Sequence, residues 1–308
     1  MASGGRRRGR WVALGVGVAL VAAGFWLWPR LAGPLGLVEP VVDTVPPELP
    51  AGLAGAPLAV LDFSKTSGFR HEDAIPAAHA SVAAIAARRG WAVFRTENAA
   101  VFDDDLLGAF DVVFGNNITG DNWTAGQKAA FARWIEAGGG FVGVHGAAGT
   151  RYRYWDWYTD VLLGGGRFIG HPMFPQFQEA RVVVEDRAHP IMAGFGADFR
   201  HEDEWYTFEA SPRDAGSHVL ATLDESTYTP EAFGDDLRMG DHPIIWVACP
   251  GRGRSFYSAL GHGAATYRRP DHEAMLEAAL AWAGDRASPC PGGGGGDARP
   301  ADQPDTGR

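Results

Sequence analysis

Short apolar runs alternate with helix-like patterns in the first half of the chain. The runs are bounded by glycine or polar residues and contain few charged positions, which is typical of buried strands. The residues between them predict helices over 75–89 and 124–137, with Thr124 as a cap and Gly90 as a stop. This alternation predicts a parallel sheet covered by helices on both faces. The predicted strands are 57–63, 91–96, 111–115 and a short strand that follows the glycine turn at 138–140 and ends in His145.

The second half of the chain is richer in strand patterns. Alternating or continuous apolar stretches predict five more strands and a closing helix over 271–282. We expect these strands to extend the first sheet and to add an antiparallel layer. The predicted fold class is α/β, a three-layer sandwich with additional β-strands in the C-terminal half. The five strands are 178–184, 204–208, 219–223, 243–247 and 254–259.

The strand that follows the glycine turn at 138–140 ends in a histidine, His145, which lies between Gly143 and Gly146. Small neighbours let the backbone turn sharply and hold one side chain at the carboxyl edge of a sheet, where ligands of open α/β sheets collect. Enzymes with a nucleophile elbow carry Ser or Cys at such a position. Histidine is a poor nucleophile there, but it carries protons and binds metals well.

Several other polar residues lie at predicted strand ends, so they are candidates for the same edge. Histidines with a carboxylate can transfer protons or bind a divalent cation such as zinc. Their spacing matches no short metal motif such as HExxH. Each histidine could instead be a turn residue that is hydrogen-bonded to the backbone. We predict His145 and Glu204 to be catalytic, His71, Asn116, Asn117 and Tyr206 to bind substrate, and His171 and His262 to bind a metal.

Other histidines and both cysteines are expected to have no part in such a site. His79 and His272 lie on predicted helices, where we expect them to be exposed to solvent. Cys249 closes an apolar run and is expected to be a small buried residue. Cys290 lies in a tail rich in proline and glycine and is not expected to pair with it.

The charge of the chain excludes some partners. A formal net charge of −10 and an isoelectric point near 5.4 argue against a basic face for nucleic acid or an anionic membrane surface.

The two ends of the chain differ from the middle. Arginines precede an uncharged run over 11–29 that is long enough to span a bilayer, so we expect residues 1–30 to form a cytoplasmic start and a membrane anchor. A cleaved signal peptide, with secretion of the domain, is the alternative. Either alternative places the domain on the extracytoplasmic side. Residues 31–56 resemble a proline-rich tether, 57–284 a folded domain, and 285–308 a disordered tail.

Six motifs in order along residues 57–284 resemble the ThuA-like family, named for trehalose utilisation. Each motif is weak alone, but their order is specific. The resemblance implies a flavodoxin-like α/β fold, similar to class I glutamine amidotransferases, with an elbow after the strand at residue 140. The motifs are FRH at 69–71, GGGFVGVHGA at 138–147, LLGGGRFIGHP at 162–172, DEWY at 203–206, HPIIW at 242–246 and GRGRSFYSALGH at 251–262.

The resemblance also implies a class of function. It suggests action on small carbohydrates, such as trehalose-like disaccharides or their keto derivatives. An amidotransferase of that superfamily needs a cysteine thiolate at the elbow, whereas this chain has His145 there, so we expect no glutaminase activity. The alternatives to a carbohydrate enzyme are a non-catalytic extracytoplasmic carbohydrate-binding module and a purely structural protein of the cell envelope.

Overall fold

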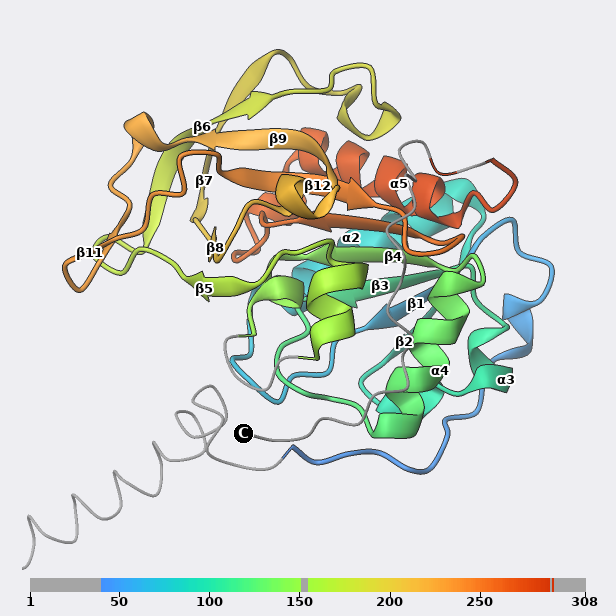
Figure 1. Ribbon diagram of the computed structural model, residues 1–308. Helices are drawn as coiled ribbons and strands as arrows, with labels where there is room; N and C mark the ends of the chain where they lie inside the picture. Colours follow the sequence, from blue (N-terminus) through green and yellow to red (C-terminus); the bar gives the residue numbers. More distant parts are fainter. Residues whose placement is uncertain (1–39, 151–154, 289, 291–308) are drawn as a thin grey trace, which may run out of the picture.

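A nine-stranded sheet forms the centre of the molecule (Figure 1). The computed structural model describes residues 40–150, 155–288 and 290. In chain order the strands of this sheet are β1 (Ala59–Phe63), β2 (Ala92–Thr96), β3 (Val112–Asn116), β4 (Gly140–Val144), β6 (Phe177–Val184), β7 (Asp198–Glu204), β9 (His218–Asp224), β12 (Pro243–Ala248) and β13 (Arg254–Ser258). Across the sheet their order is β2-β1-β3-β4-β13-β12-β9-β6-β7.

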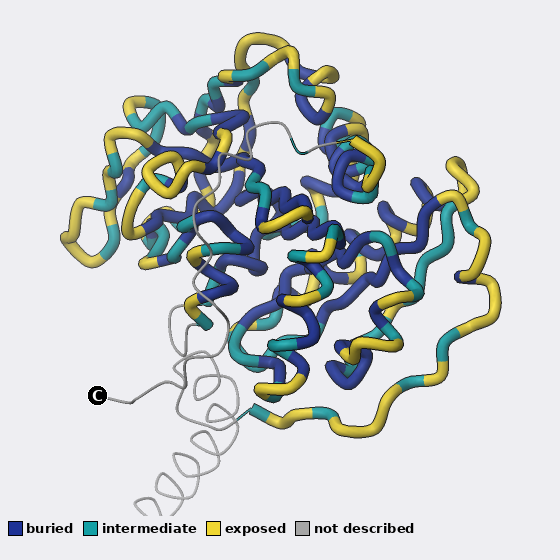
Figure 2. The backbone as a smooth tube through the Cα atoms, turned by 45° about the vertical axis from the view of Figure 1, so that its right-hand side comes forward, coloured by how far each residue is buried: buried dark blue, intermediate teal, exposed yellow. Residues whose placement is uncertain are grey.

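The first five strands in this order are parallel, as the alternation of strands and helices predicts. Strands β1, β3, β4 and β13 are buried along their whole length, so they form the centre of the core (Figure 2). Their carboxyl ends meet at one edge, and the loops that follow β1, β4 and β13 carry the histidines considered below.

Helices cover both faces of this parallel half. Helices α2 (Ala74–Arg89) and α5 (Pro270–Gly284) lie on one face and α4 (Ala125–Glu136) on the other (Figure 1). Gly140 allows α5 to approach closely, because a Cβ there would lie 2.4 Å from the carbonyl oxygen of Ala283. Thr124 starts α4 with a capping box, and Gly90 ends α2 in the left-handed conformation, as predicted.

The shorter helices lie in the connections between strands. They are α3 (Asp104–Leu107), the π-helical turn η4 (Trp157–Leu162), and the 3-10 helices η1 (Ala51–Leu53), η2 (Ala99–Val101), η3 (His145–Ala148), η5 (Pro190–Met192), η6 (Pro212–Ala215), η7 (Glu225–Thr227) and η8 (Thr266–Arg268).

The antiparallel strands of the second half continue the same sheet and do not form a layer of their own. Register shifts interrupt the pairing of β12 with β9, and such irregularities bend a sheet and increase its twist. Two short ribbons are added, β5 (Phe168–Gly170) with β8 (Thr207–Phe208) and β10 (Glu231–Ala232) with β11 (Asp235–Asp236). The strand predicted at 204–208 is therefore divided, since Glu204 ends β7 and Thr207 begins β8.

Two predictions about helical histidines are wrong, because both side chains are buried. His79 is 7% exposed and pairs with the carboxylate of Asp62. His272 is 2% exposed, and neither of its ring nitrogens has a hydrogen-bond partner among the described residues. Burial lowers the pKa of His272 to about 4, so its side chain is neutral at neutral pH.

The prediction that the two cysteines do not pair is also wrong. A disulfide joins Cys249 to Cys290. Cys249 follows the last residue of β12, where Ala248 pairs with Ser255 near the start of β13. The disulfide therefore lies at the edge of the sheet opposite to the carboxyl ends of the parallel strands. It holds the residues after α5 against the domain, and Arg254 assists by donating to the carbonyl oxygen of Ser288 at 2.7 Å.

The described part of the predicted tether also contacts the domain. Asp43 accepts from the backbone N–H of Ala99 at 2.9 Å, and its carbonyl oxygen accepts from Gln127 at 2.7 Å. No helix within the described residues is long and apolar enough to cross a membrane. The predicted anchor at 11–29 lies outside the described residues and stays a prediction.

The disulfide predicts a redox-dependent stability. We expect replacement of Cys249 and Cys290 by serine to lower the free energy of unfolding by roughly 2–4 kcal/mol, because the bond restricts the unfolded chain across a separation of 41 residues. Denaturant unfolding with and without dithiothreitol measures this. The reductant should destabilise the wild type and leave the double variant unchanged; equal stability of all four samples would contradict the expectation.

Candidate functional site

The backbone at the end of β4 turns sharply and presents His145 at the carboxyl edge. His145 has a φ of 41°, a left-handed conformation that is rare for histidine and costs on the order of 1–3 kcal/mol. Gly146 is needed beside it, since a Cβ there would lie 3.0 Å from the carbonyl oxygen of Asn117. Tyr257 donates to the carbonyl oxygen of His145 at 2.9 Å. The predicted elbow is present, with His145 fully buried at its tip.

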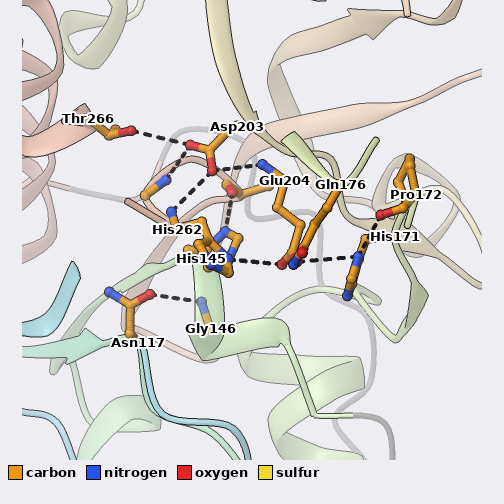
Figure 3. A network of polar contacts seen from close by, with 12 residues as sticks. Asn117, His145, Gly146, His171, Pro172, Gln176, Asp203, Glu204, His262 and Thr266 are labelled. Atoms are coloured by element: carbon orange, nitrogen blue, oxygen red, sulfur yellow. Dashed lines mark hydrogen bonds and ion pairs between the residues drawn. The ribbon is translucent and has the colours of Figure 1, made fainter. Parts of the chain in front are cut away.

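The orientation of the His145 ring is fixed by the backbone. Its Nδ1 lies 2.8 Å from the carbonyl oxygen of Ala259. A carbonyl oxygen only accepts, so Nδ1 carries a proton and Nε2 is directed into the site. This Nε2 lies 3.1 Å from Nδ1 of His262 and 3.4 Å from Oε2 of Glu204 (Figure 3).

The two oxygens of the Glu204 carboxylate have different neighbours. Oε2 lies 3.1 Å from Nδ1 of His262, so it faces His145 and His262 together. Oε1 accepts a short hydrogen bond from Gln176 and lies 3.3 Å from Nδ1 of His171 (Figure 3). Glu204 is only 3% exposed, and these contacts on both oxygens compensate for the removal of its charge from water.

His71 completes a compact group at the carboxyl edge. It follows β1 in the chain, and its ring makes edge contacts with those of His145 and His262, with both centroid distances 4.8 Å. Its Nδ1 is buried without a hydrogen-bond partner among the described residues. One ligand atom each from His71, His145, Glu204 and His262 lies within 4.8 Å of the other three. These four residues, called the His3Glu centre below, are arranged so that they could hold a metal ion.

Asp203 supports the His3Glu centre and was not among the predicted site residues. Its buried carboxylate accepts from the backbone N–H groups of Gly261 at 2.8 Å and His262 at 3.1 Å, which fixes the loop after β13. His201 and Thr266 contact the same carboxylate. Burial opposes ionisation, but these hydrogen bonds and the neighbouring histidine charges lower the pKa of Asp203 to about 2. The sequence signal was adjacency to Glu204, which alone does not separate a supporting residue from a solvated one.

The remaining predicted residues lie around the His3Glu centre. Tyr206 packs on His145 with a centroid distance of 4.2 Å. Asn117 lies behind the turn, where its Oδ1 is 3.4 Å from the N–H of Gly146. Asn116 points to the other side of the strand, toward Ile75 and His79. His171 contacts Glu204 and lies outside the His3Glu centre.

The electrostatics of the site favour an ion pair. Burial alone would lower the pKa of His145, but the hydrogen bond to Glu204 and the charges of Asp203 and Glu204 raise it above 6.5. Burial alone would raise the pKa of Glu204, but its hydrogen bonds with His145 and His262 lower it far below its usual range. Burial and the charges of the other two histidines lower the pKa of His71 well below its usual value, so His71 is neutral.

A pocket lined by aromatic residues opens beside η3. It encloses about 400 Å³, part of it open solvent, and Trp123, Trp155 and Tyr158 line it together with Ala147 of η3. The indole Nε1 of Trp123 and Oδ1 of Asp121 are buried there without hydrogen-bond partners among the described residues. Both atoms are buried, so the surface of the pocket is made largely of apolar ring faces.

Comparison with known proteins shows which family and which solved structures the chain is similar to. The ThuA family model, described as trehalose utilisation, matches residues 59–283. A ThuA-like protein from Bacteroides uniformis is 27% identical, with 77% of this chain and 95% of that chain covered and a TM-score of 0.64. One from Parabacteroides merdae is 19% identical, with 74% and 90% covered and a TM-score of 0.56. No curated protein matches the chain.

The comparisons agree with the predicted fold class. The chain has the α/β fold of ThuA-like proteins. A glutaminase domain from Trypanosoma brucei is also among the structures with a similar fold, at 12% identity, with 73% of this chain and 94% of that chain covered and a TM-score of 0.44. The chain has two cysteines, and both are in the disulfide. A thiolate at the elbow, which a glutaminase of that superfamily needs, is therefore absent.

The support role of Asp203 predicts a large loss of stability when its carboxylate is removed. Asp203→Ala leaves two backbone N–H groups without an acceptor and should lower the free energy of unfolding by on the order of 3–5 kcal/mol. Glu202→Ala, on the exposed side of the same strand, is the matched control and should change it by less than about 0.5 kcal/mol. Urea unfolding of both variants measures the difference, and similar values for the two would show that Asp203 has no such role.

Proposed function

The chain belongs to the ThuA family, and on that premise we propose that it acts on a small carbohydrate, such as a trehalose-like disaccharide or a keto-sugar derivative, at the His3Glu centre. The observation that carries this proposal is the buried pair of His145 and Glu204 at the carboxyl edge of the sheet. Opposite charges held 3.4 Å apart away from water form a proton donor and acceptor whose strength is set by their surroundings. Glycosidic and hydroxyl oxygens of a sugar are groups on which such a pair can act.

The chemistry at this centre can take two forms. In the first, the protonated His145 gives its Nε2 proton to a glycosidic oxygen as the bond between that oxygen and the anomeric carbon breaks, and Glu204 stabilises the positive charge that develops on the sugar. Water then adds to the anomeric carbon, and its proton returns to His145. In the second, the same side chains would hold a divalent metal, which would supply Lewis acidity toward the sugar or a water molecule. Both forms place the substrate against His145 and Glu204, and both differ from the thiolate chemistry of a glutaminase.

The aromatic pocket beside η3 supports a carbohydrate as the ligand class. Sugars present apolar C–H faces and hydroxyl edges, so they bind well to ring surfaces that are flanked by polar groups. Trp123 and Tyr158 supply ring surfaces, and Asp121 and Thr159 add polar side chains to the lining. Ala147 of η3 lines this pocket two residues after His145, which brings the pocket close to the elbow in the chain.

We further propose that the domain works outside the cytoplasm, either anchored by residues 11–29 or secreted. The disulfide between Cys249 and Cys290 supports this location, because disulfides persist in oxidising compartments and are rare in the cytosol. The arginine-rich start and the apolar run that follows it are independent support from the sequence.

Substrate and side-chain roles are tested together. Full-length protein is incubated with a panel of disaccharides, glycosides and keto-sugars, and products are followed by mass spectrometry and NMR. We expect turnover of at least one sugar and a decrease in kcat of about 10²–10⁴-fold in both His145→Gln and Glu204→Gln, because each variant removes an ionisable group from the centre. Glu202→Gln, on the exposed side of β7, should retain wild-type activity.

Two results would contradict this proposal. Neither binding nor turnover of any sugar by folded protein would exclude carbohydrates as the ligand class. Stoichiometric binding of a sugar that is recovered unchanged would favour the non-catalytic binding module.

The location is tested by the redox state of the cysteines in cells. Native protein is denatured in the presence of an alkylating agent without reductant, and its mass is measured. We expect Cys249 and Cys290 to stay unmodified until a reductant is added. Immediate modification of both cysteines would contradict an oxidising location.

A further inference from the structure

We propose that the His3Glu centre binds a divalent transition-metal ion, and that Zn²⁺ is the ion its donors suit best. The ligands assigned are His71, His145, His262 and Glu204. This assignment differs from the one made from the sequence, which placed a metal at His171 and His262. The role of the ion in sugar chemistry rests on the proposed function, whereas the binding itself does not.

The spacing of three donor atoms matches the coordination sphere of such an ion. His145 Nε2 to His262 Nδ1 is 3.1 Å, His262 Nδ1 to Glu204 Oε2 is 3.1 Å, and His145 Nε2 to Glu204 Oε2 is 3.4 Å. Bonds of about 2.0–2.1 Å to a tetrahedral zinc place neighbouring ligand atoms about 3.4 Å apart. The three atoms thus already form a triangle close to one face of that tetrahedron, and His71 lies near enough to supply the fourth ligand.

Contacts around the centre orient His145, Glu204 and the loop of His262 for coordination. The Ala259 carbonyl fixes the proton of His145 on Nδ1, which leaves Nε2 as the coordinating atom. Backbone or carboxylate acceptors on the far nitrogen are the usual companions of metal-ligating histidines. Gln176 and His171 occupy Oε1 of Glu204, so Oε2 is left for the ion. Asp203 fixes the loop that carries His262 through two backbone N–H groups.

Without a metal, some ligand atoms of the centre lack a suitable hydrogen-bond partner among the described residues. Nδ1 of His262 faces both His145 Nε2 and Glu204 Oε2. Each of these three atoms can accept a proton, and a single shared proton cannot satisfy all three. His71 is buried against both other rings, yet its Nδ1 has no partner among the described residues. Polar atoms buried without partners are costly, and a cation that replaces the shared protons would satisfy the group.

The donor types select the ion. Three imidazole nitrogens and one carboxylate oxygen suit zinc, cobalt or manganese, whereas Mg²⁺ and Ca²⁺ prefer oxygen ligands and would bind poorly. A bound ion would supply Lewis acidity toward a sugar oxygen or a water molecule, which would have to enter as a fifth ligand beside the four side chains of the His3Glu centre.

The test measures binding without sugar. Full-length protein with any affinity tag removed is stripped with EDTA and titrated with Co²⁺, which reports its ligands through visible absorption, and with Zn²⁺, which is quantified by elemental mass spectrometry after desalting. We expect about one equivalent of either ion in the wild type and none of Mg²⁺. His71→Ala and His262→Ala should each weaken binding by at least 100-fold.

Two controls keep the outcome interpretable. His218→Ala removes an exposed histidine that pairs with Asp186 and should bind like the wild type. His218 begins β9 and pairs with Val247 near the end of β12, at the edge of the sheet opposite to the His3Glu centre. His171→Ala separates the present ligand set from the sequence-based one, because the chain should still take up one equivalent. Folding of every variant is confirmed by circular dichroism.

Specific results would overturn the metal proposal. They are absence of Co²⁺ and Zn²⁺ binding by the folded wild type, or unchanged uptake in both His71→Ala and His262→Ala. Metal binding in a protein that handles no sugar would reject the proposed function alone. Sugar turnover by protein from which EDTA has removed the metal would reject a role of the ion in that turnover, whereas the titration alone decides the binding.

Discussion

The burial of the Glu204 carboxylate is the constraint on which the rest of the site depends. A carboxylate that is 3% exposed is stable as an anion only if hydrogen bonds and positive charge replace its hydration. Gln176 and His171 satisfy one oxygen, and His145 and His262 satisfy the other. Four separate chain segments must therefore meet at this residue. The strained turn at His145 directs that side chain toward Glu204, and the Asp203 contacts fix the loop that carries His262.

The curvature of the sheet explains how these segments meet. Three strands, β12, β9 and β6, separate β13 from β7 in the strand order, yet the end of β7 lies 3.1 Å from the loop after β13 at Glu204 and His262. A flat sheet would hold the two strand ends far apart, because neighbouring strands are about 4.8 Å apart. The register shifts between β12 and β9 give the sheet an irregular position at which it can bend.

The sequence predicted the parallel half of the fold well because its signals are local. Apolar runs, the Thr124 cap and the Gly90 stop each act within a few residues, and the structure has elements within one or two residues of those predicted. It did not predict the form of the antiparallel half, where the division at Glu204 depends on pairing with distant strands. The disulfide was missed for the same reason, since contacts after α5 bring Cys290 back to Cys249.

The site was predicted only as far as chain topology allows. Positions in loops after predicted strands identified His71, His145 and His262, because parallel strands bring such ends together. The separate role of each histidine could not be predicted from the sequence, because it depends on which ring nitrogen faces which neighbouring group. His171 and His262 look alike in the chain, yet His262 faces Oε2 of Glu204 beside His145, and His171 faces Oε1. The two oxygens of Glu204 thus have separate neighbours: Oε2 belongs to the His3Glu centre, and Oε1 contacts His171 and Gln176 outside it.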